Sequence, residues 1–236
     1  MQIMRESTIA QNGQKKRAGE FFSKLSAAAL ADLEAMEFPT LYPADMVLFT
    51  EKQTPQGVYI VVSGEVKLSM NSQDGKRLIL RIARAGELLG LPAAINGGLS
   101  EITAETLHPA RIAVIDRADF LGFLSRHPEA YQALTIELSR HLNMVCEQLR
   151  TVGLSSSAPE KLARLLLDWS ENGQTTDAGT RFHFPLTHEE IGEFIGTSRE
   201  TVTRTLSAFK MRRLVACHGA TLVIPSRMAL ESFARC

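Results

Sequence analysis

The sequence predicts an α+β fold with three parts: a roll of short strands, a long helix, and a small C-terminal domain that contains two short helices. Between positions 39 and 116, short apolar segments alternate with turn residues, as they do in barrels and jelly rolls. From position 134 to position 152 a narrow apolar stripe recurs at helical spacing. Residues 187–206 then have the pattern of two capped helices joined by a glycine turn. The 236 residues are enough for two domains with cores of their own.

The composition is that of a globular protein without signals for export or membrane insertion. The 26 basic and 26 acidic residues cancel to a formal net charge of +0, which argues against a general positive coat for nucleic acid. The cysteines Cys146, Cys217 and Cys236 form no CxxC pair, so we expect no zinc or cluster site and a reducing compartment. The sequence has no signal-peptide core and no apolar run of membrane-spanning length, so we expect a cytoplasmic protein without a membrane partner.

Composition and periodicity divide the chain into four expected segments. Residues 1–18 are polar, include the basic run Lys15-Lys16-Arg17, and are expected to form a flexible arm. Residues 19–126 hold the strands of the roll, and residues 127–153 hold the long helix. Residues 154–236 form the C-terminal domain.

Five strands are expected in the roll, after a helical pattern that runs from Gly19 to Glu37. Each strand is a short apolar or alternating segment bounded by turn residues. The dipeptide Asp74-Gly75, between the third and fourth strands, is a strong signal for a hairpin turn. The expected strands are Val47–Phe49, Val58–Val62, Glu65–Met70, Leu78–Ile82 and Arg111–Ile115.

The apolar stripe of the long helix steps by three or four residues, which is close to a heptad seam. Such a stripe is either the buried face of one helix or the seam of a two-stranded dimer, and its narrowness and length favour the dimer. The predicted dimer interface is Leu134, Leu138, Leu142, Val145, Leu149 and Val152. A run of Gly, Ser and Pro from 153 to 159 breaks the pattern and predicts a hinge.

A helix is expected to open the C-terminal domain, because Ser157 and Glu160 have the spacing of a capping box. Its apolar residues are Leu162, Leu165, Leu166 and Trp169. The polar run 171–180 predicts a loop. Near the end of the chain, segments 214–217 and 221–224 flank a short turn and predict a hairpin, placed as the wing of a winged helix-turn-helix.

The two-helix unit of residues 187–206 carries its own start and stop signals. Thr187 and Glu190 form a capping box for the first helix. Gly196 supplies the turn that follows, because glycine accepts a positive φ. Thr197 or Ser198 is expected to cap the second helix, and Thr197 with Glu200 has the spacing of another capping box.

The second helix has two unlike faces. One face is apolar, with Val202, Leu206 and Phe209. The opposite face carries Arg199, Glu200, Thr203, Arg204 and Ser207. Between positions 196 and 216 the basic residues outnumber the acids five to one, so the local charge is positive although the chain is neutral. A helix held by its apolar face in this way can enter the DNA major groove.

The chain resembles the CRP/FNR superfamily of bacterial transcription regulators over almost its whole length. Residues 57–66 are similar to the early β-roll strands of the family, and residues 85–90 to the approach to its effector site. Residues 191–204 are nearly the family's DNA-reading signature. The resemblance implies a cyclic-nucleotide-binding-like β-roll, a dimerisation helix and a winged helix-turn-helix domain. It also implies a homodimeric regulator, not an enzyme, whose partners are double-stranded DNA and RNA polymerase.

The resemblance also implies roles for the second helix and its neighbours. In the catabolite activator branch, the residues that match Arg199, Glu200 and Arg204 contact bases of a TGTGA-type half-site. Thr203 lies on the same face and is also expected to read bases. An arginine fork fits guanine and a carboxylate accepts from the cytosine amino group. Glu200 also has a rival role as a capping-box residue. The positions expected to bond backbone phosphates are Thr187, His188, Ser198 and Thr201.

The effector cassette departs from the pattern of the cAMP-binding members. There, a Gly-Glu pair holds the ribose and an Arg-Ser pair holds the cyclic phosphate. Here Leu91 follows Gly90, and Glu101 occupies the arginine position, where an acid would repel the phosphate. No arginine lies between Arg84 and Arg111. We therefore expect no control by cAMP. The effector-pocket candidates are Gly90, Leu91, Glu101, Ile102, Val145 and Cys146.

What replaces cAMP stays open, and no cofactor is predicted. A haem sensor would need an axial ligand, for which the candidates are His108, His127 and His141. A thiol-based redox sensor would use Cys146 in the long helix. An apolar or other non-nucleotide ligand is also consistent with the sequence, as is a roll that serves only dimerisation or protein interaction. A cupin-like metal enzyme is excluded, because His108 is the only histidine in the roll.

Overall fold

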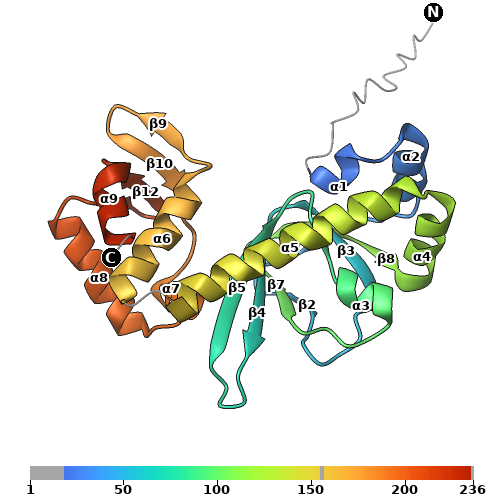
Figure 1. Ribbon diagram of the computed structural model, residues 1–236, viewed down its shortest axis with the longest axis horizontal. Coiled ribbons are helices and arrows are strands. Elements are labelled where there is room, and N and C mark those ends of the chain that lie inside the picture. Colours follow the sequence, from blue (N-terminus) through green and yellow to red (C-terminus); the bar gives the residue numbers. More distant parts are fainter. Residues whose placement is uncertain (1–18, 155–156, 235–236) are drawn as a thin grey trace, which may run out of the picture.

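The computed structural model describes residues 19–154 and 157–234. The long helix α5 (Glu129–Leu154) runs between two domains, with the roll against one end and the C-terminal domain at the other (Figure 1). The predicted N-terminal arm, residues 1–18, lies outside the described residues, as do residues 155 and 156 of the predicted hinge. None of the helices in the described ranges has the length and hydropathy needed to cross a membrane.

The roll consists of two four-stranded antiparallel sheets, with the strand orders β1-β8-β3-β6 and β2-β7-β4-β5. All five predicted strands are confirmed. The sequence did not indicate β1, β6 and β7, which are only two to four residues long. The strands are β1 (Thr40–Tyr42), β2 (Val47–Phe49), β3 (Gly57–Ser63), β4 (Glu65–Asn71), β5 (Arg77–Arg84), β6 (Leu88–Leu89), β7 (Thr103–Thr106) and β8 (Ala110–Asp116).

The predicted hairpin turn at Asp74-Gly75 is also confirmed. It joins β4 to β5, with Gly75 at a φ of 76°. The amide of Ser72 donates to the carbonyl of Lys76 at 2.8 Å, which closes the turn.

Four helices cover the roll: α1 (Glu20–Ser23), α2 (Ala27–Ala35), α3 (Leu91–Asn96) and α4 (Arg117–Arg126). The helical pattern expected over residues 19–37 is in fact two helices. The chain turns between them because Ser26 starts α2, its side-chain oxygen accepting the amide of Ala29 at 3.2 Å. Helix α3 was not predicted. The helices and the roll enclose a core that includes Phe21, Phe120 and Phe123, each 1% exposed or less.

Helix α5 corrects two expectations about the long helix. Leu134 is only 5% exposed and belongs to the core just described, so it is not available to a dimer interface. Helix α5 packs on α1 of the same chain, which covers this end of the stripe. The helix also continues through Gly153 to Leu154, so the glycine does not end it.

The C-terminal domain packs three helices and a terminal helix against one antiparallel sheet of order β11-β12-β10-β9. The predicted wing hairpin is confirmed as β11 and β12, although β11 begins at Ala216 and not at Leu214. Leu214 and Val215, which precede it, are buried. The predicted loop 171–180 contains β9 and the start of β10, and α9 was not predicted. The elements are α6 (Ala158–Ser170), β9 (Gln174–Thr176), β10 (Gly179–His183), α7 (His188–Ile195), α8 (Arg199–Met211), β11 (Ala216–His218), β12 (Thr221–Ile224) and α9 (Arg227–Ala234).

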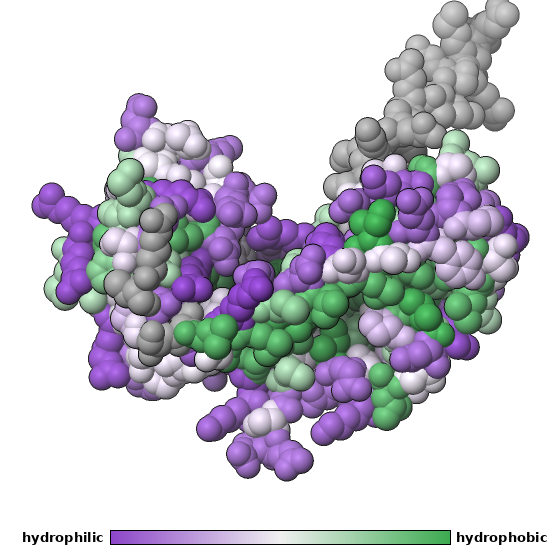
Figure 2. Space-filling model, viewed as in Figure 1, coloured by the Kyte–Doolittle hydropathy of each residue, from purple (hydrophilic) through white to green (hydrophobic). Residues whose placement is uncertain are grey.

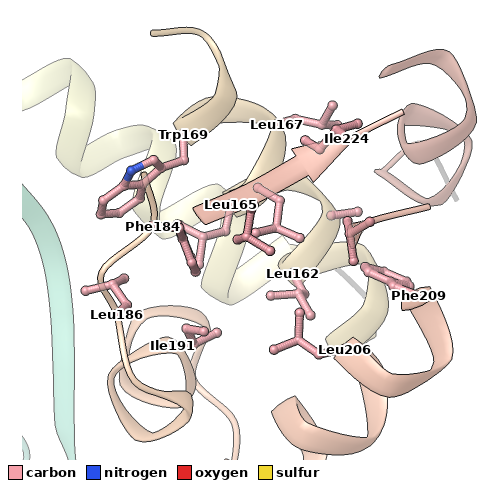
Figure 3. Packing of buried hydrophobic residues seen from close by; sticks show 14 of the residues in the cluster. Leu162, Leu165, Leu167, Trp169, Phe184, Leu186, Ile191, Leu206, Phe209 and Ile224 are labelled. Carbon is pink, nitrogen blue, oxygen red and sulfur yellow. The ribbon is translucent and has the colours of Figure 1, made fainter. Parts of the chain in front are cut away.

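The core of this domain is formed where α6, α7, α8 and the sheet meet (Figure 3). Leu162, Leu206 and Phe209 face one another there, all 5% exposed or less. The predicted N-cap of α6 is confirmed at Ser157, which accepts the amide of Glu160 at 3.3 Å. The Glu160 carboxylate pairs with Arg164 at 2.9 Å. This core holds the exposed side of α8 in a fixed position.

Candidate nucleic-acid interface

The turn between α7 and α8 is built as its sequence predicts. The amide of Glu190 donates to Thr187 Oγ1 at 3.2 Å, and the amide of Thr187 donates to Glu190 Oε2 at 2.8 Å, which completes the capping box. Gly196 ends α7 in the left-handed conformation, with φ 65° and ψ 47°. The amide of Thr197 bonds back to the carbonyl of Gly192 at 2.9 Å. These bonds fix the angle at which α8 leaves α7.

Replacing Gly196 with alanine is expected to lower the free energy of unfolding by about 1–2 kcal/mol, because a Cβ makes the left-handed conformation costly. The added Cβ would also lie 3.2 Å from Val152 Cγ1. Gly153→Ala is the matched control, since its Cβ would meet nothing within 4 Å and the residue is helical. Urea unfolding of both variants checks the prediction, and equal stabilities would contradict it.

The start of α8 differs from one expectation. Ser198 is the N-cap, with its Oγ accepting the amide of Thr201 at 3.3 Å, so the proposed capping box of Thr197 and Glu200 is wrong. Glu200 lies in the first turn of the helix instead. Hydrogen bonds from its own amide and from the Ser198 side chain lower the pKa of Glu200. The carboxylate is therefore charged at neutral pH and exposed at the positive end of the helix.

The two faces of α8 are separated as predicted. Val202, Leu206 and Phe209 are buried in the domain core. The polar face is exposed and comprises Arg199, Glu200, Thr203, Arg204 and Ser207. Two of these side chains are oriented locally: Arg204 Nη2 donates to Thr201 Oγ1 at 3.2 Å, and Thr203 Oγ1 donates to the carbonyl of Arg199 at 2.9 Å. The face is thus ordered and open to a partner.

The four residues predicted to bond phosphates lie at the N-termini of α7 and α8. The hydroxyls of Thr187 and Ser198 are the N-caps of α7 and α8. His188 Nδ1 lies 2.8 Å from Thr203 Oγ1, which places the start of α7 against the exposed face of α8. Thr187, Ser198, Thr201 and His188 therefore border the polar face. The five basic residues of this region, Arg199, Arg204, Lys210, Arg212 and Arg213, are all exposed.

The remainder of the apolar stripe on α5 forms an exposed band (Figure 2). Leu142 and Leu149 are 64% and 61% exposed, values that are high for leucine in a monomer. Leu138, Val145 and Val152 are half-buried beside them. Tyr131, seven residues before Leu138, is 51% exposed and continues the band where the sequence had placed Leu134. We call Tyr131, Leu138, Leu142, Val145, Leu149 and Val152 the α5 band.

A cavity of about 370 Å³ lies between the roll and α5. Five of the six predicted pocket residues line it, namely Gly90, Leu91, Glu101, Ile102 and Val145. Cys146 does not line it and is exposed, because the next residue along a helix points about 100° away. Of the three haem-ligand candidates, His141 lines the cavity, His108 is exposed, and His127 lies 2.9 Å from Asp32.

Beside the cavity lies a charged cluster that the sequence did not reveal. Arg81 from β5 donates to Glu87, and Arg140 from α5 lies 2.6 Å from Glu137 and 3.2 Å from Glu87. His141 Nε2 is 3.0 Å from Glu137 Oε1. Burial acts to raise the pKa of Glu137, but the bonds from His141 and Arg140 outweigh it and lower the pKa to about 2.

Three members of this cluster, Glu87, Glu137 and His141, each place a ligand atom within 4.8 Å of the others, a spacing that a metal ion could use. Both carboxylates already bind arginines, however, and a cation would have to displace them. The cluster is therefore better described as a salt-bridge network.

The C-terminal domain is also held against the roll, through α7. Lys67 on β4 is 4% exposed, and its Nζ lies 2.8 Å from Glu190, 3.1 Å from Glu105 and 3.7 Å from Asp45. Arg77 on β5 pairs with Glu105 at 2.6 Å. The Lys67–Glu190 pair joins the roll to the C-terminal domain, whereas the other three pairs lie within the roll. None of the four was predicted.

Gln148 on α5 makes a second bridge. Its Nε2 donates to the carbonyl of Ile79 on β5 at 2.9 Å and to the carbonyl of Phe194 on α7 at 2.6 Å. The amide is buried, with 6% of the residue exposed. The position of the α7–α8 unit relative to the roll is thus set by buried polar contacts.

Comparison with known proteins supports both domains. A model described as a cyclic nucleotide-binding domain matches residues 39–127, and a model described as a Crp-like helix-turn-helix domain matches residues 160–233. The chain is 28% identical over 220 residues to a CRP-like cAMP-activated global transcriptional regulator of Mycobacterium tuberculosis, covering 93% of this chain and 97% of that protein. It is 25% identical over 207 residues to the transcriptional activatory protein AadR of Rhodopseudomonas palustris, covering 86% and 85%.

Solved structures share the fold. FixK2 from Bradyrhizobium japonicum superposes with a TM-score of 0.75 at 21% identity, covering 85% of this chain and 98% of that one. A CooA mutant from Carboxydothermus hydrogenoformans superposes with a TM-score of 0.73 at 20% identity, covering 92% and 100%. The order of roll, long helix and C-terminal domain is therefore an established architecture.

Proposed function

The chain belongs to the CRP/FNR superfamily of DNA-binding transcription regulators, and from this premise we propose that it is a homodimer that reads an inverted repeat of TGTGA-like half-sites without control by cAMP. We expect it to act in the cytoplasm, with RNA polymerase as its partner on DNA and without catalytic activity. The observation that carries the proposal is the ordered, exposed face of α8 with Arg199, Glu200 and Arg204.

The chemistry of this face supports reading of G·C base pairs. A guanidinium donates two parallel hydrogen bonds to the O6 and N7 atoms of guanine, and a carboxylate accepts from the N4 amino group of cytosine. Arg199 and Glu200 lie in the first turn of α8, and Arg204 lies one turn further on the same face. The first turn of a recognition helix is the part that reaches the base edges.

The α5 band supports the dimer. A monomer that exposes leucines in a row along one helix leaves apolar surface in water, and a second copy of the helix would cover it. A two-fold dimer presents two α8 helices and therefore requires an inverted repeat, with half-site centres about 10 base pairs apart.

The surroundings of the cavity support independence from cAMP. Leu91 is fully buried where a ribose-binding carboxylate would be needed. Among the described residues that line the cavity there is one arginine, Arg81, and its guanidinium already donates to Glu87. A cyclic phosphate would meet no unpaired cation among these lining residues.

The test is binding of the full chain to a DNA duplex that carries an inverted TGTGA repeat, followed by footprinting at one stated salt concentration, because phosphate contacts make affinity salt-dependent. We expect protection of both half-sites by a dimer, and a change in Kd of less than about twofold on addition of cAMP. The control duplex has one half-site scrambled. Equal affinity for both duplexes would contradict the reading of an inverted repeat, and a large cAMP effect would contradict the independence from cAMP.

A further inference from the structure

We propose that the cavity between the roll and α5 binds a neutral, largely apolar small molecule and discriminates against anions. The inference rests on the proposed function, because it names the class of ligand for the regulatory site of such a regulator. At about 370 Å³ the cavity lies in the lower part of the size range of small-molecule sites.

The wall of the cavity is apolar. Burial of a ligand against such a wall is favourable in proportion to the apolar area that leaves water. The apolar lining residues come from both sheets of the roll, from α3, from the segment between α3 and β7, and from α5: Leu68, Leu80, Leu88, Leu89, Leu91, Pro92, Ala93, Leu99, Ile102, Leu138, Leu142 and Val145.

The polar lining groups are mostly occupied within the protein. Ser100 Oγ donates to the carbonyl of Ile102 at 2.8 Å and accepts its amide at 3.3 Å. Asn96 Oδ1 accepts the amide of Gly98 at 2.7 Å. The His141 Nε2 atom faces Glu137 at 3.0 Å. Glu101 is exposed. A ligand gains little from polar groups here, since it would have to replace bonds that already exist.

The charges beside the cavity cancel. Arg81 and Arg140 are matched by Glu87 and Glu137, and the Arg81 and Glu87 side chains are 11% and 13% exposed. An anionic ligand could bind Arg81 only by displacing Glu87, which would separate this mostly buried carboxylate from one of its two arginine partners and leave it with Arg140. A neutral ligand leaves the network intact. The charge balance thus selects against anions even though two arginines lie close by.

The position of the cavity connects ligand binding to the α5 band. Leu138, Leu142 and Val145 belong both to the cavity wall and to the band. A molecule in the cavity would pack against the helix that we propose as the dimer seam, and it would favour whichever arrangement of the two helices it fits better. The ligand would in this way shift the population of the DNA-binding form.

Two fluorescent probes that share one ring system test the proposed preference for a neutral ligand over an anion. N-phenyl-1-naphthylamine is neutral, and 8-anilinonaphthalene-1-sulfonate adds a sulfonate to the same rings. We expect the neutral probe to bind the full chain about tenfold more tightly than the sulfonate. Leu99→Glu, at a residue that lines the cavity and is 57% exposed, should weaken the neutral probe by about tenfold. The matched control is Leu41→Glu, a 68% exposed leucine on β1 that does not line the cavity.

A second variant should reduce the preference for the neutral probe. Glu87→Gln removes the carboxylate that neutralises Arg81, so the sulfonate probe should gain affinity relative to the neutral probe. The inference is overturned if the neutral probe does not bind, if both probes bind the wild type equally, if Leu99→Glu and Leu41→Glu behave alike, or if Glu87→Gln leaves the ratio unchanged.

Operator binding of the same preparations separates this inference from the proposed function. Retained binding to the inverted repeat without binding of the neutral probe would overturn the ligand class alone. Binding of the neutral probe without recognition of the inverted repeat would overturn the DNA-reading proposal and leave the ligand class standing.

Discussion

Replacing Lys67 with alanine is expected to lower the free energy of unfolding by about 3–5 kcal/mol, the range found when one partner of a buried ion pair is removed. The lysine is 4% exposed and is bonded to Glu190 and Glu105, from two different domains. Its loss would leave both carboxylates partly buried beside one another. Trp169, the single tryptophan, lies in the C-terminal core, so its fluorescence in urea reports the loss of that domain.

The effect should depend on pH. Burial acts to raise the pKa values of Glu190 and Glu105. Hydrogen bonds from Lys67 to Glu190, and from Arg77 and Lys67 to Glu105, act in the opposite direction and outweigh burial, so the pKa of each carboxyl is lowered. A carboxylate whose folded pKa is lowered stabilises the fold above its unfolded pKa, about 4.3, and this contribution is lost as the pH falls through the folded pKa. The gap between wild type and Lys67→Ala should therefore be full at pH 7 and shrink below about pH 4.3.

The control for this prediction is Lys76→Ala, which removes an exposed lysine from the nearby β4–β5 turn. Surface substitutions of this kind change stability by about 0.5 kcal/mol or less. If Lys67→Ala and Lys76→Ala unfolded at the same urea concentration at pH 7, the contact between β4 and α7 would not contribute to stability as described.

Replacing Arg204 with alanine is expected to weaken operator binding by about 1–3 kcal/mol, or roughly 5- to 150-fold, and to relax specificity at one guanine. The guanidinium is exposed, and its Nη2 is held by Thr201 Oγ1 at 3.2 Å, so it is ordered before DNA arrives. Alanine cannot donate to guanine, and the base at that position would no longer be distinguished from the others.

The measurement is the Kd of wild type and variant for the operator and for duplexes that each change one base pair, all at the same salt concentration. Lys210→Ala is the control, an exposed lysine in the last turn of the same helix, away from the first turn that reaches the base edges. It should weaken all duplexes alike, as loss of a phosphate contact does. Unchanged discrimination by Arg204→Ala across the set would remove Arg204 from the base-reading residues.

Local sequence patterns were sufficient to predict most of the helices and strands. They failed where contacts between residues far apart in the sequence determine the secondary structure. Strand β7 has the sequence Thr-Ala-Glu-Thr and shows no apolar run. Its hydroxyls are buried because they bond the backbone: Thr106 Oγ1 donates to the carbonyl of Pro43 at 2.7 Å, and Thr103 Oγ1 accepts the amide of Glu51 at 3.1 Å. These partners, Pro43 and Glu51, are more than fifty positions away, so the sequence near β7 does not indicate them.

The same distinction holds for the site. The exposed face of α8 could be predicted, since periodicity and capping within twenty residues determine it. The charged cluster at the cavity could not, because Glu87 and Arg140 are 53 positions apart. Lys67 and Glu190 are 123 positions apart. One available signal was the presence of Lys67 and Arg81 between apolar neighbours in the strands, since a charge that becomes buried requires a partner.

The buried amide of Gln148 restricts movement of the α7–α8 unit relative to the roll. Because one side chain of α5 bonds both β5 and α7, the long helix, the roll and the α7–α8 unit are joined by direct hydrogen bonds and not through chain connectivity alone. In a dimer, the distance between the two α8 helices would then be set by a rigid frame and not by a tether. Such a frame would make binding depend on the length of the spacer between the half-sites. An operator with one base pair added to or removed from the spacer would therefore bind more weakly.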